Sequence, residues 1–444
     1  MANILENLKK YKQHFTDLFI LSVPLIVGNL GQILIGATDV FVAAKHNIST
    51  LAAISIANSV IFTIFIIGIG LMASISIVLS NYRGSRKPTK RYFQSSVNYS
   101  LILASVFCIV TLGTIPLIDK IGFEHNLVPM IKEYIKISAF SFFGIYLYNG
   151  IKEFLQAHEI VTFPNLILVV AVFLNLVLDF ALVFGFGFIP ALGVKGLAIA
   201  TLTVRTFMGI TLLLYCYRLI RFEKTLNQDY IKQLLKIGYP IGFALLLEFL
   251  AFNIITILVG KTEGILAATH NIITTITSAT FMIPLAISNA IAIKVGYYNG
   301  ARNYKEIRQY SLVGTSISTI FMAVCAVLLI VFPTFFINIF TTSPKIMSIA
   351  IPIIFVAGIF QIVDGFQVSV SGILKGLKMT KTVSACILSG YWLLGLPLGF
   401  ILAYKFNYSL KGFWIGLAVS LFVIGIIQAF IIVKKFKQLK SEYN

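Results

Sequence analysis

Twelve long apolar segments constrain this 444-residue chain more than any other feature. Each contains at least about 18 largely apolar residues, enough for a helix to cross a hydrocarbon core. A membrane β-barrel would instead show alternating segments of roughly ten residues. We therefore expect an all-α polytopic membrane protein with twelve transmembrane helices. The predicted spans are 18–44, 51–80, 97–118, 131–156, 163–186, 194–217, 235–260, 267–295, 310–337, 347–374, 381–404 and 411–436.

The basic residues are sorted by side of the membrane. The formal net charge is +19. With the N-terminus placed inside, 24 of the 35 Lys and Arg residues fall in inner segments and 8 in outer loops. This bias predicts a multi-pass protein of the cell membrane with both termini in the cytoplasm. The basic charge is assigned to topology and to anionic lipid headgroups, so the lipid bilayer is an expected partner and nucleic acid is not.

An internal repeat with an offset of 216 residues relates the two halves of the chain. Pro24 falls on Pro240, Gly84 falls on Gly300, and Lys195-Gly196 falls on Lys411-Gly412. Each half contains six spans, so both halves enter from the same side, and a pseudo-twofold axis along the membrane normal is expected. The predicted division is an N-lobe at 1–217, a cytoplasmic linker at 218–234 and a C-lobe at 235–444.

Four carboxylates lie inside predicted spans with almost no basic residue beside them: Asp39, Asp179, Glu248 and Asp364. A charged side chain near the bilayer centre costs at least about 2.5 to 3.5 kcal/mol on insertion scales. Such residues therefore suggest binding of a proton or another cation, and hence transport.

Depth along the helices groups these acids into two clusters. Asp39 and Asp179 lie about 8 to 10 Å below the outer boundary, from the rise of 1.5 Å per residue. Asn175 shares a helical face with Asp179, and Thr201 lies at a similar depth. Arg205, one turn from Thr201, offers the alternative of a structural ion pair with Asp179.

The second cluster lies nearer the middle of the membrane. It contains Glu248 and Asp364, with Gln361 and Gln367 flanking Asp364 at three residues on either side. These polar residues have the alternative role of holding helices together. Further candidates for a substrate pocket are an amide and three aromatic rings that suit cation–π contact: Gln32, Tyr146, Tyr148 and Phe281.

A buried carboxyl group can serve in two ways. It can bind and release a proton, or its oxygens can join nearby amide and hydroxyl oxygens around a small cation. Asp39, Asn175, Asp179 and Thr201 supply enough oxygens for a sodium ion and equally for a network around a shared proton. The proton is the preferred interpretation. No cofactor is expected beyond the transported H⁺ or Na⁺.

Six short patterns together resemble the multidrug and toxic compound extrusion (MATE) family over nearly the whole chain. They contain Pro24, Gln32 and Asp39; Phe163 through Asp179; Gly193 to Thr201; Tyr239 to Glu248; the run after Phe281; and Asp364 to Gly376. The resemblance implies a two-lobed, twelve-helix pump that expels cationic, amphipathic small molecules and is driven by proton or sodium entry. We expect it to act as a monomer.

The resemblance also implies roles for both clusters. In DinF-like members, the positions of Asp39 and Asp179, with Asn175 and Thr201 beside them, form the coupling site. In NorM-like members, the positions of Glu248 and Asp364 form a cation site. Those members carry a cation-binding Tyr where this chain has Phe360, which favours Asp39 and Asp179 for coupling here.

Other function classes fit less well. A flippase for lipids or lipid-linked oligosaccharides, the nearest alternative, would favour an interior rich in cations for pyrophosphate. An enzyme is not expected, because the chain contains no HExxH motif and no paired GxGD-like signature. A channel would be expected to show a repeated filter-like loop, which this sequence does not.

Overall fold

The computed structural model describes residues 2–187, 190–219 and 226–443, with side chains from residue 11 onward except that of Leu219, and these residues are almost entirely helical. Within them, eleven helical segments are long and apolar enough to cross a membrane. The remaining predicted span, 131–156, corresponds to α5 (Leu127–Ala157), a helix of 31 residues that carries several charges. The prediction of an all-α protein with twelve long helices is therefore confirmed.

The contacts divide the chain into two compact units. The N-terminal unit consists of Val27–Leu79 and Lys87–Gly242. The C-terminal unit consists of Met1–Ile26, Ser80–Arg86 and Phe243–Asn444. The predicted lobes, 1–217 and 235–444, divide the chain by sequence position, whereas these units are defined by contacts, so the lobes remain a prediction. Residues 220–225 of the predicted linker lie outside the described residues.

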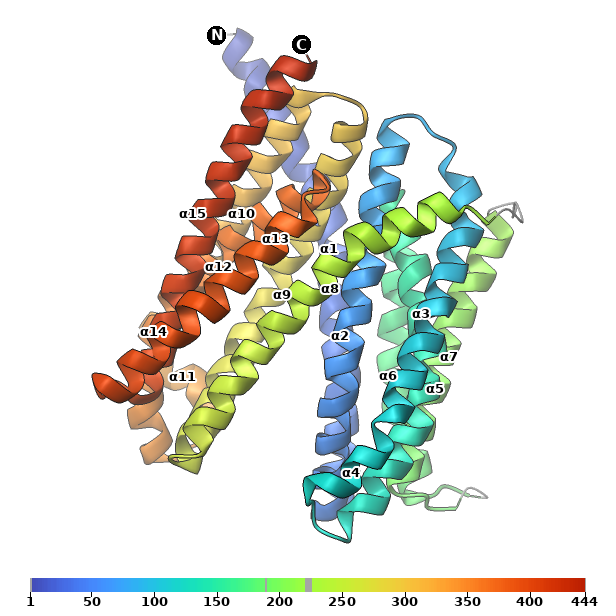
Figure 1. The fold of residues 1–444 in the computed structure, drawn as a ribbon, viewed down its shortest axis with the longest axis vertical. Helices are drawn as coiled ribbons and strands as arrows, with labels where there is room; N and C mark the ends of the chain where they lie inside the picture. The colour runs from blue at the N-terminus through green and yellow to red at the C-terminus, as the bar shows by residue number, and fades with distance from the viewer. Residues whose placement is uncertain (1, 188–189, 220–225, 444) are drawn as a thin grey trace. The chain divides into compact units, whose positions relative to one another are not determined.

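The helices of the N-terminal unit, coloured from blue to green in Figure 1, pack side by side as a bundle. Helix α5 packs against α3 and α7, and α6 packs against α7. The helices and their bounds are α1 (Ala2–His46) from Val27 onward, α2 (Ile48–Gly84) up to Leu79, η1 (Thr89–Tyr92), α3 (Phe93–Gly113), α4 (Ile115–Ile121), α5, α6 (Thr162–Phe184), α7 (Val194–Leu219) and the start of α8 (Gln228–Gly260).

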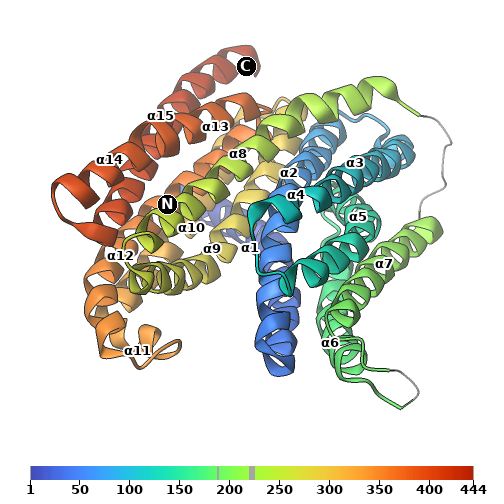
Figure 2. The ribbon, with the colours of Figure 1, turned by 60° about the horizontal axis from the view of Figure 1, so that its bottom comes forward.

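The C-terminal unit is also a bundle of helices, drawn mainly in yellow to red in Figure 2, and its contacts correspond to those of the N-terminal unit. Helix α12 packs against α10 and α15, as α5 does against α3 and α7. This unit contains the start of α1, the end of α2 and the rest of α8. Its complete helices are α9 (Gly264–Gly300), α10 (Tyr304–Val331), α11 (Pro333–Asn338), α12 (Pro344–Gly376), α13 (Thr380–Ile387), η2 (Leu388–Gly395), α14 (Leu396–Phe400), η3 (Ile401–Lys405) and α15 (Ser409–Tyr443).

Hydrogen bonds explain why α1 and α8 each contribute to both units. At the start of α1, the Tyr310 hydroxyl donates to Asp17 at 2.6 Å, and His14 contacts Glu306 at 2.7 Å. At the start of α8, the Tyr230 and Ser96 hydroxyls are 2.9 Å apart, which joins this end to α3 of the N-terminal unit. Prolines Pro24 and Pro240 lie inside these two helices shortly before the change of unit.

Two predicted spans are not single continuous helices, because each is divided into a long helix and a short one. The span 97–118 breaks between α3 and α4, where Pro116 occupies the first turn of the new helix. The span 310–337 breaks in the same way between α10 and α11, at Pro333. Proline has no N–H to donate and suits the first turn of a helix, so a new short helix begins at each position.

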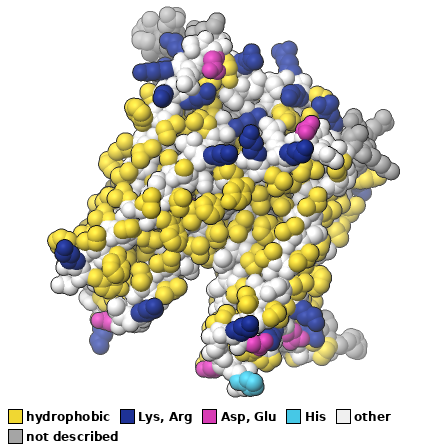
Figure 3. Space-filling model, viewed as in Figure 1, with side chains coloured by type: hydrophobic (Ala, Val, Ile, Leu, Met, Phe, Trp, Pro, Cys, Tyr) yellow, Lys and Arg dark blue, Asp and Glu magenta, His cyan; other side chains and the backbone are white. Residues whose placement is uncertain are grey.

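Both chain ends lie at the same end of the C-terminal unit. His14, near the start of α1, contacts Glu306 at the start of α10. Tyr443, at the end of α15, donates to Asn299 at the end of α9. Asn299 and Glu306 lie on either side of the short turn that joins α9 to α10. On the face shown in Figure 3, hydrophobic side chains cover the middle of the helices, and Lys and Arg side chains gather at their ends. This distribution is that of a membrane protein.

Candidate functional site

The structure brings together the four residues of the first predicted cluster. The side-chain amide of Asn175 donates to Asp39 Oδ1 at 2.8 Å and to Asp179 Oδ2 at 2.7 Å. The Thr201 hydroxyl donates to Asp39 Oδ2 at 3.3 Å. All four side chains are buried, with at most 4% of any residue exposed. We call these four residues the N-terminal cluster.

Three helices position the N-terminal cluster. Asp39 comes from α1, Asn175 and Asp179 come from consecutive turns of α6, and Thr201 comes from α7, which packs against α6. Helix α1 approaches α6 closely because Gly28 has no side chain, and a Cβ atom there would collide with Asn165 Oδ1. Small residues permit such close helix contacts within a membrane.

The two carboxyl groups of the N-terminal cluster lie close together, because Asp39 Oδ1 and Asp179 Oδ2 both accept from the same Asn175 nitrogen, at 2.8 Å and 2.7 Å. Two carboxylates cannot both be ionised at such a separation without strong repulsion. Asp179 Oδ1 and Asn175 Oδ1 are buried and have no hydrogen-bond partner among the described residues. Chemically, the cluster suits a proton held between the acids, or a cation that accepts these free oxygens as ligands.

Arg205 does not form the alternative ion pair with Asp179. Its Nη1 donates to Ser141 Oγ at 2.8 Å, and its guanidinium lies 5.6 Å from the ring centroid of Phe65. In the described part of the chain, no Lys or Arg nitrogen lies within 4.0 Å of either acid of the cluster.

A second group lies in the C-terminal unit. Glu248 on α8 is half-buried, and Asp364 on α12 is buried. The ring of Phe252, one turn after Glu248 on α8, lies 6.3 Å from the ring of Tyr391 and 6.3 Å from the ring of Phe360. The buried Tyr391 and Asp364, which follows Phe360 by one turn, therefore lie near Glu248. We call Glu248, Asp364 and Tyr391 the C-terminal cluster. Phe360, one turn before Asp364, has no hydroxyl and packs 5.4 Å from the ring of Trp414.

Tyr391 is the residue that sequence reasoning missed. It belongs to η2, where the helix widens to a π-helical turn, and the neighbouring Trp392 donates Nε1–H to the Leu247 carbonyl at 3.1 Å. π-Helical turns are often found at functional sites. No residue pattern marks such a turn in the sequence, although the glycines and the proline at 390–397 indicate an irregular helix.

The two predicted glutamines beside Asp364 connect helices. Gln361 donates to the Thr280 hydroxyl of α9 at 2.8 Å, next to Phe281, which is half-exposed. Gln367 donates to Ser371 at 2.9 Å, and Ser371 in turn donates to Gln428 of α15 at 2.9 Å. Gln361 Oε1 is buried and has no partner among the described residues, so Gln361 retains an unused acceptor.

The remaining substrate-pocket candidates differ in exposure. Tyr146 and Tyr148 are fully buried, and their hydroxyls donate to the carbonyls of Phe65 at 3.4 Å and Pro164 at 2.8 Å. Gln32 is half-buried and donates to Asn149 at 3.4 Å. In this conformation Tyr146 and Tyr148 therefore serve helix packing, while Gln32 keeps some access to solvent or ligand.

Comparison with known proteins places this arrangement in a family. Residues 24–181 and 240–401 match the family model MatE. A probable multidrug resistance protein NorM of Photorhabdus laumondii is 30% identical over 430 residues, which cover 94% of this chain and 95% of that protein. A protein of the same name in Bacillus cereus is 27% identical over 452 residues, which cover 98% of each chain.

Solved structures show the same fold. A MOP superfamily transporter from Pyrococcus furiosus has a TM-score of 0.88 at 21% identity, covering 96% of this chain and 97% of the other. A MATE structure in a bent conformation has a TM-score of 0.89 at 20% identity, covering 98% and 99%. With the family model matching well over half of its length, the chain belongs to the MatE family, whose members are transporters and not enzymes.

Proposed function

We propose that this transporter is a secondary active antiporter that exports cationic or amphipathic small molecules. The support is its full-length similarity to proteins named as probable multidrug resistance proteins. Buried acids in both units provide the charge that an exporter of cations needs. Inward movement of a proton or a sodium ion supplies the energy.

The proposed coupling site is the N-terminal cluster, and the preferred ion is the proton. The observation that carries this proposal is the close pair of Asp39 and Asp179, bridged by Asn175 and without a Lys or Arg within 4.0 Å among the described residues. A proton bound between the acids removes their repulsion. Release of the proton restores the repulsion. The cluster therefore has a protonated state and a less stable deprotonated state.

Sodium is the alternative ion. The free oxygens of Asp179 and Asn175, with those of Asp39 and Thr201, are the ligands that a small hard cation prefers. The C-terminal cluster is a proposed second cation site, in which Tyr391 would supply the phenol oxygen that Phe360 lacks. Imposing the two ion gradients separately distinguishes these assignments.

The fold alone does not determine the cargo. The structure of the Pyrococcus furiosus relative is described as having a binding pocket of reverse polarity that suggests a different function. A flippase for lipid-linked pyrophosphates would need cationic groups in the interior. Here the interior contains four acids, against Arg205, which is hydrogen-bonded to Ser141, and two buried lysines, Lys152 and Lys294, within two turns of the ends of α5 and α9. We therefore prefer a cationic cargo. Gln32, Gln361 and Phe281 are the proposed contacts.

We also propose that the protein works as a monomer in the cell membrane with both termini in the cytoplasm. The two ends of the chain lie at the same end of the C-terminal unit. The excess of Lys and Arg in the segments at that end supports a cytoplasmic location.

Efflux of ethidium, an aromatic cation, from proteoliposomes tests the proposal. We expect an imposed proton gradient to drive efflux, and Asp39→Asn and Asp179→Asn each to reduce it at least ten-fold. Asp119→Asn is the matched control, because Asp119 is an exposed carboxylate that pairs with Lys132 at 2.6 Å outside both clusters. Full efflux by both cluster variants would refute the coupling site, whereas loss in Glu248→Gln alone would move it to the C-terminal cluster.

A further inference from the structure

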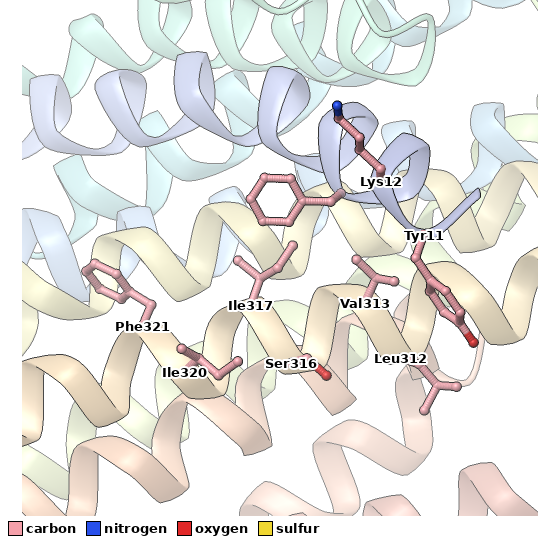
Figure 4. A pocket seen from close by; sticks show the side chains of 9 residues that line it. Tyr11, Lys12, Leu312, Val313, Ser316, Ile317, Ile320 and Phe321 are labelled. Atoms are coloured by element: carbon pink, nitrogen blue, oxygen red, sulfur yellow. The ribbon is translucent and has the colours of Figure 1, made fainter. Parts of the chain in front are cut away.

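An apolar groove runs along the C-terminal unit between α1 and α10. Its cavity has a volume of about 650 Å³. Figure 4 shows Tyr11 and Lys12 at one end and Ile320 and Phe321 at the other. We call it the α1–α10 groove, and its lining includes Tyr11, Lys12, Phe15, Leu312, Ser316 and Ile320.

A second, smaller cavity continues the α1–α10 groove toward the middle of the helices. It has a volume of about 240 Å³ and shares Ile317 and Phe321 with the first. Along α1 the two extend from Tyr11 to Ile26, or about 22 Å at 1.5 Å per residue. This length exceeds the roughly 15 Å hydrocarbon thickness of one leaflet. The groove is therefore long enough for an acyl chain that ends in a headgroup.

Basic side chains surround the end of the groove nearest the N-terminus. Lys12 lines it directly, and Arg308 lies one helical turn before Leu312 on α10. Both side chains are exposed, and among the side chains from residue 11 onward no carboxylate oxygen lies within 4.0 Å of either. A positive mouth above an apolar groove matches an amphipathic anion.

Two acids lie near this mouth among the side chains from residue 11 onward, Asp17 on α1 and Glu306 on α10, and both are engaged by other residues. Asp17 accepts a hydrogen bond from Tyr310 at 2.6 Å, and Glu306 contacts His14 at 2.7 Å. His14 is buried, and its ring lies edge-on to Tyr310 at 4.4 Å. These contacts hold both carboxylates away from Lys12 and Arg308, so the mouth keeps its positive charge.

A hydroxyl group lies one turn below the mouth. Ser316 follows Leu312 by four residues on α10, is exposed and lines the groove. One turn of helix corresponds to about 5.4 Å. In a phospholipid, the ester oxygens lie just below the phosphate, so a donor at this depth matches that chemistry.

We propose that the α1–α10 groove binds an anionic phospholipid, with its phosphate at Lys12 and Arg308, its ester oxygens at Ser316 and one acyl chain along the groove. The lipid comes from the leaflet at which the N-terminus lies. Its chain fills the space between α1 and α10, and thereby holds the first half of α1 against the C-terminal unit. The site is separate from both acidic clusters and does not depend on the proposed transport function.

Native mass spectrometry of the purified protein tests this proposal with phosphatidylglycerol and phosphatidylcholine. We expect tighter binding of phosphatidylglycerol, which carries a net negative charge. Lys12→Gln and Arg308→Gln should each weaken it about five-fold, the expected contribution of one basic residue near anionic lipid. Ser316→Phe, which fills the groove with a ring, should reduce binding of both lipids.

Lys437→Gln is the matched control, because Lys437 is an exposed lysine on α15 outside the groove. It should bind phosphatidylglycerol as the parent does. Soluble glycerol phosphate, which has no acyl chain, should not compete. Equal binding of the two lipids by the parent, or equal losses in Lys437→Gln and Lys12→Gln, would overturn the proposal. Unchanged lipid binding by a folded Ser316→Phe protein would also overturn it.

Discussion

Asn175 donates its side-chain amide to Asp179, one helical turn further along α6, at 2.7 Å. The same nitrogen also reaches Asp39 on α1 at 2.8 Å and the Thr38 hydroxyl at 2.9 Å. An amide has only two N–H hydrogens, so these three acceptors compete for two donors. Asn175 is therefore the link through which a change at either acid affects the other.

Replacing Asn175 by Leu removes this link while nearly preserving side-chain size. We expect proton-driven efflux to fall at least ten-fold, because a hydrogen bond to a charged group contributes about 1.5 to 3 kcal/mol and two are lost. Ethidium efflux under an imposed proton gradient measures the effect. Asn253→Leu is the control, since the Asn253 amide donates to the Phe249 carbonyl of its own helix and lies outside both clusters. Equal losses in both variants would argue against a specific role for Asn175.

We expect the Tyr391 hydroxyl to interact with the Glu248 carboxyl, because Phe252 beside Tyr391 and Leu247 beside Trp392 flank Glu248 on α8. A double-mutant cycle measures this interaction. We expect Tyr391→Phe and Glu248→Gln to be non-additive in thermal stability, with a coupling of about 1 kcal/mol, as found for side chains in contact. Purified protein in detergent provides the measurement. The pair Tyr391→Phe and Asp119→Asn serves as the reference and should be additive. Additivity of the first pair would show that the hydroxyl and the carboxyl do not interact.

Arg205 should be dispensable as a partner of Asp179. Because the guanidinium is hydrogen-bonded to Ser141, Arg205→Gln does not remove an ion-pair partner from either acid. We expect this variant to retain proton-driven efflux within about three-fold of the parent. A much larger loss would be expected if Arg205 were the ion-pair partner of Asp179, because its removal would then leave a buried charge unpaired. In addition, Arg205→Gln should not rescue Asp179→Asn. Rescue would show that the two charges compensate each other during transport.

Close contact between α5 and α7 depends on Gly144. A Cβ atom there would lie 2.5 Å from the backbone carbonyl oxygen of Arg205, which has no room to move. We expect Gly144→Ala to destabilise the protein by about 1 to 3 kcal/mol, the usual effect of overpacking. Gly36→Ala is the matched control on α1, because nothing lies within 4 Å of its Cβ position. Thermal unfolding should separate the two variants clearly.

The sequence predicts the helices well because hydrocarbon thickness sets their minimum length and apolar content. It also brings Asp39, Asn175, Asp179 and Thr201 together, since depth and helical spacing leave few alternatives. It does not predict the position of Tyr391, because a π-helical turn changes which side of the helix a residue faces. Nor does it predict that Tyr148 is buried. The Tyr148 hydroxyl donates to the Pro164 carbonyl of a neighbouring helix, and residue type does not reveal which helices are neighbours.

The depth of Asp39 has an electrical consequence. Asp39 lies seven residues before the end of α1 at His46, which is about 10 Å along the helix, or about a third of a 30 Å hydrocarbon core. An ion that reaches it from that side therefore crosses about a third of the transmembrane voltage. At about 2.3 kcal/mol per charge for each 100 mV, this fraction corresponds to about 0.8 kcal/mol. Occupancy of the acid pair by a cation should thus rise with an inside-negative potential, even where the concentrations on the two sides are equal.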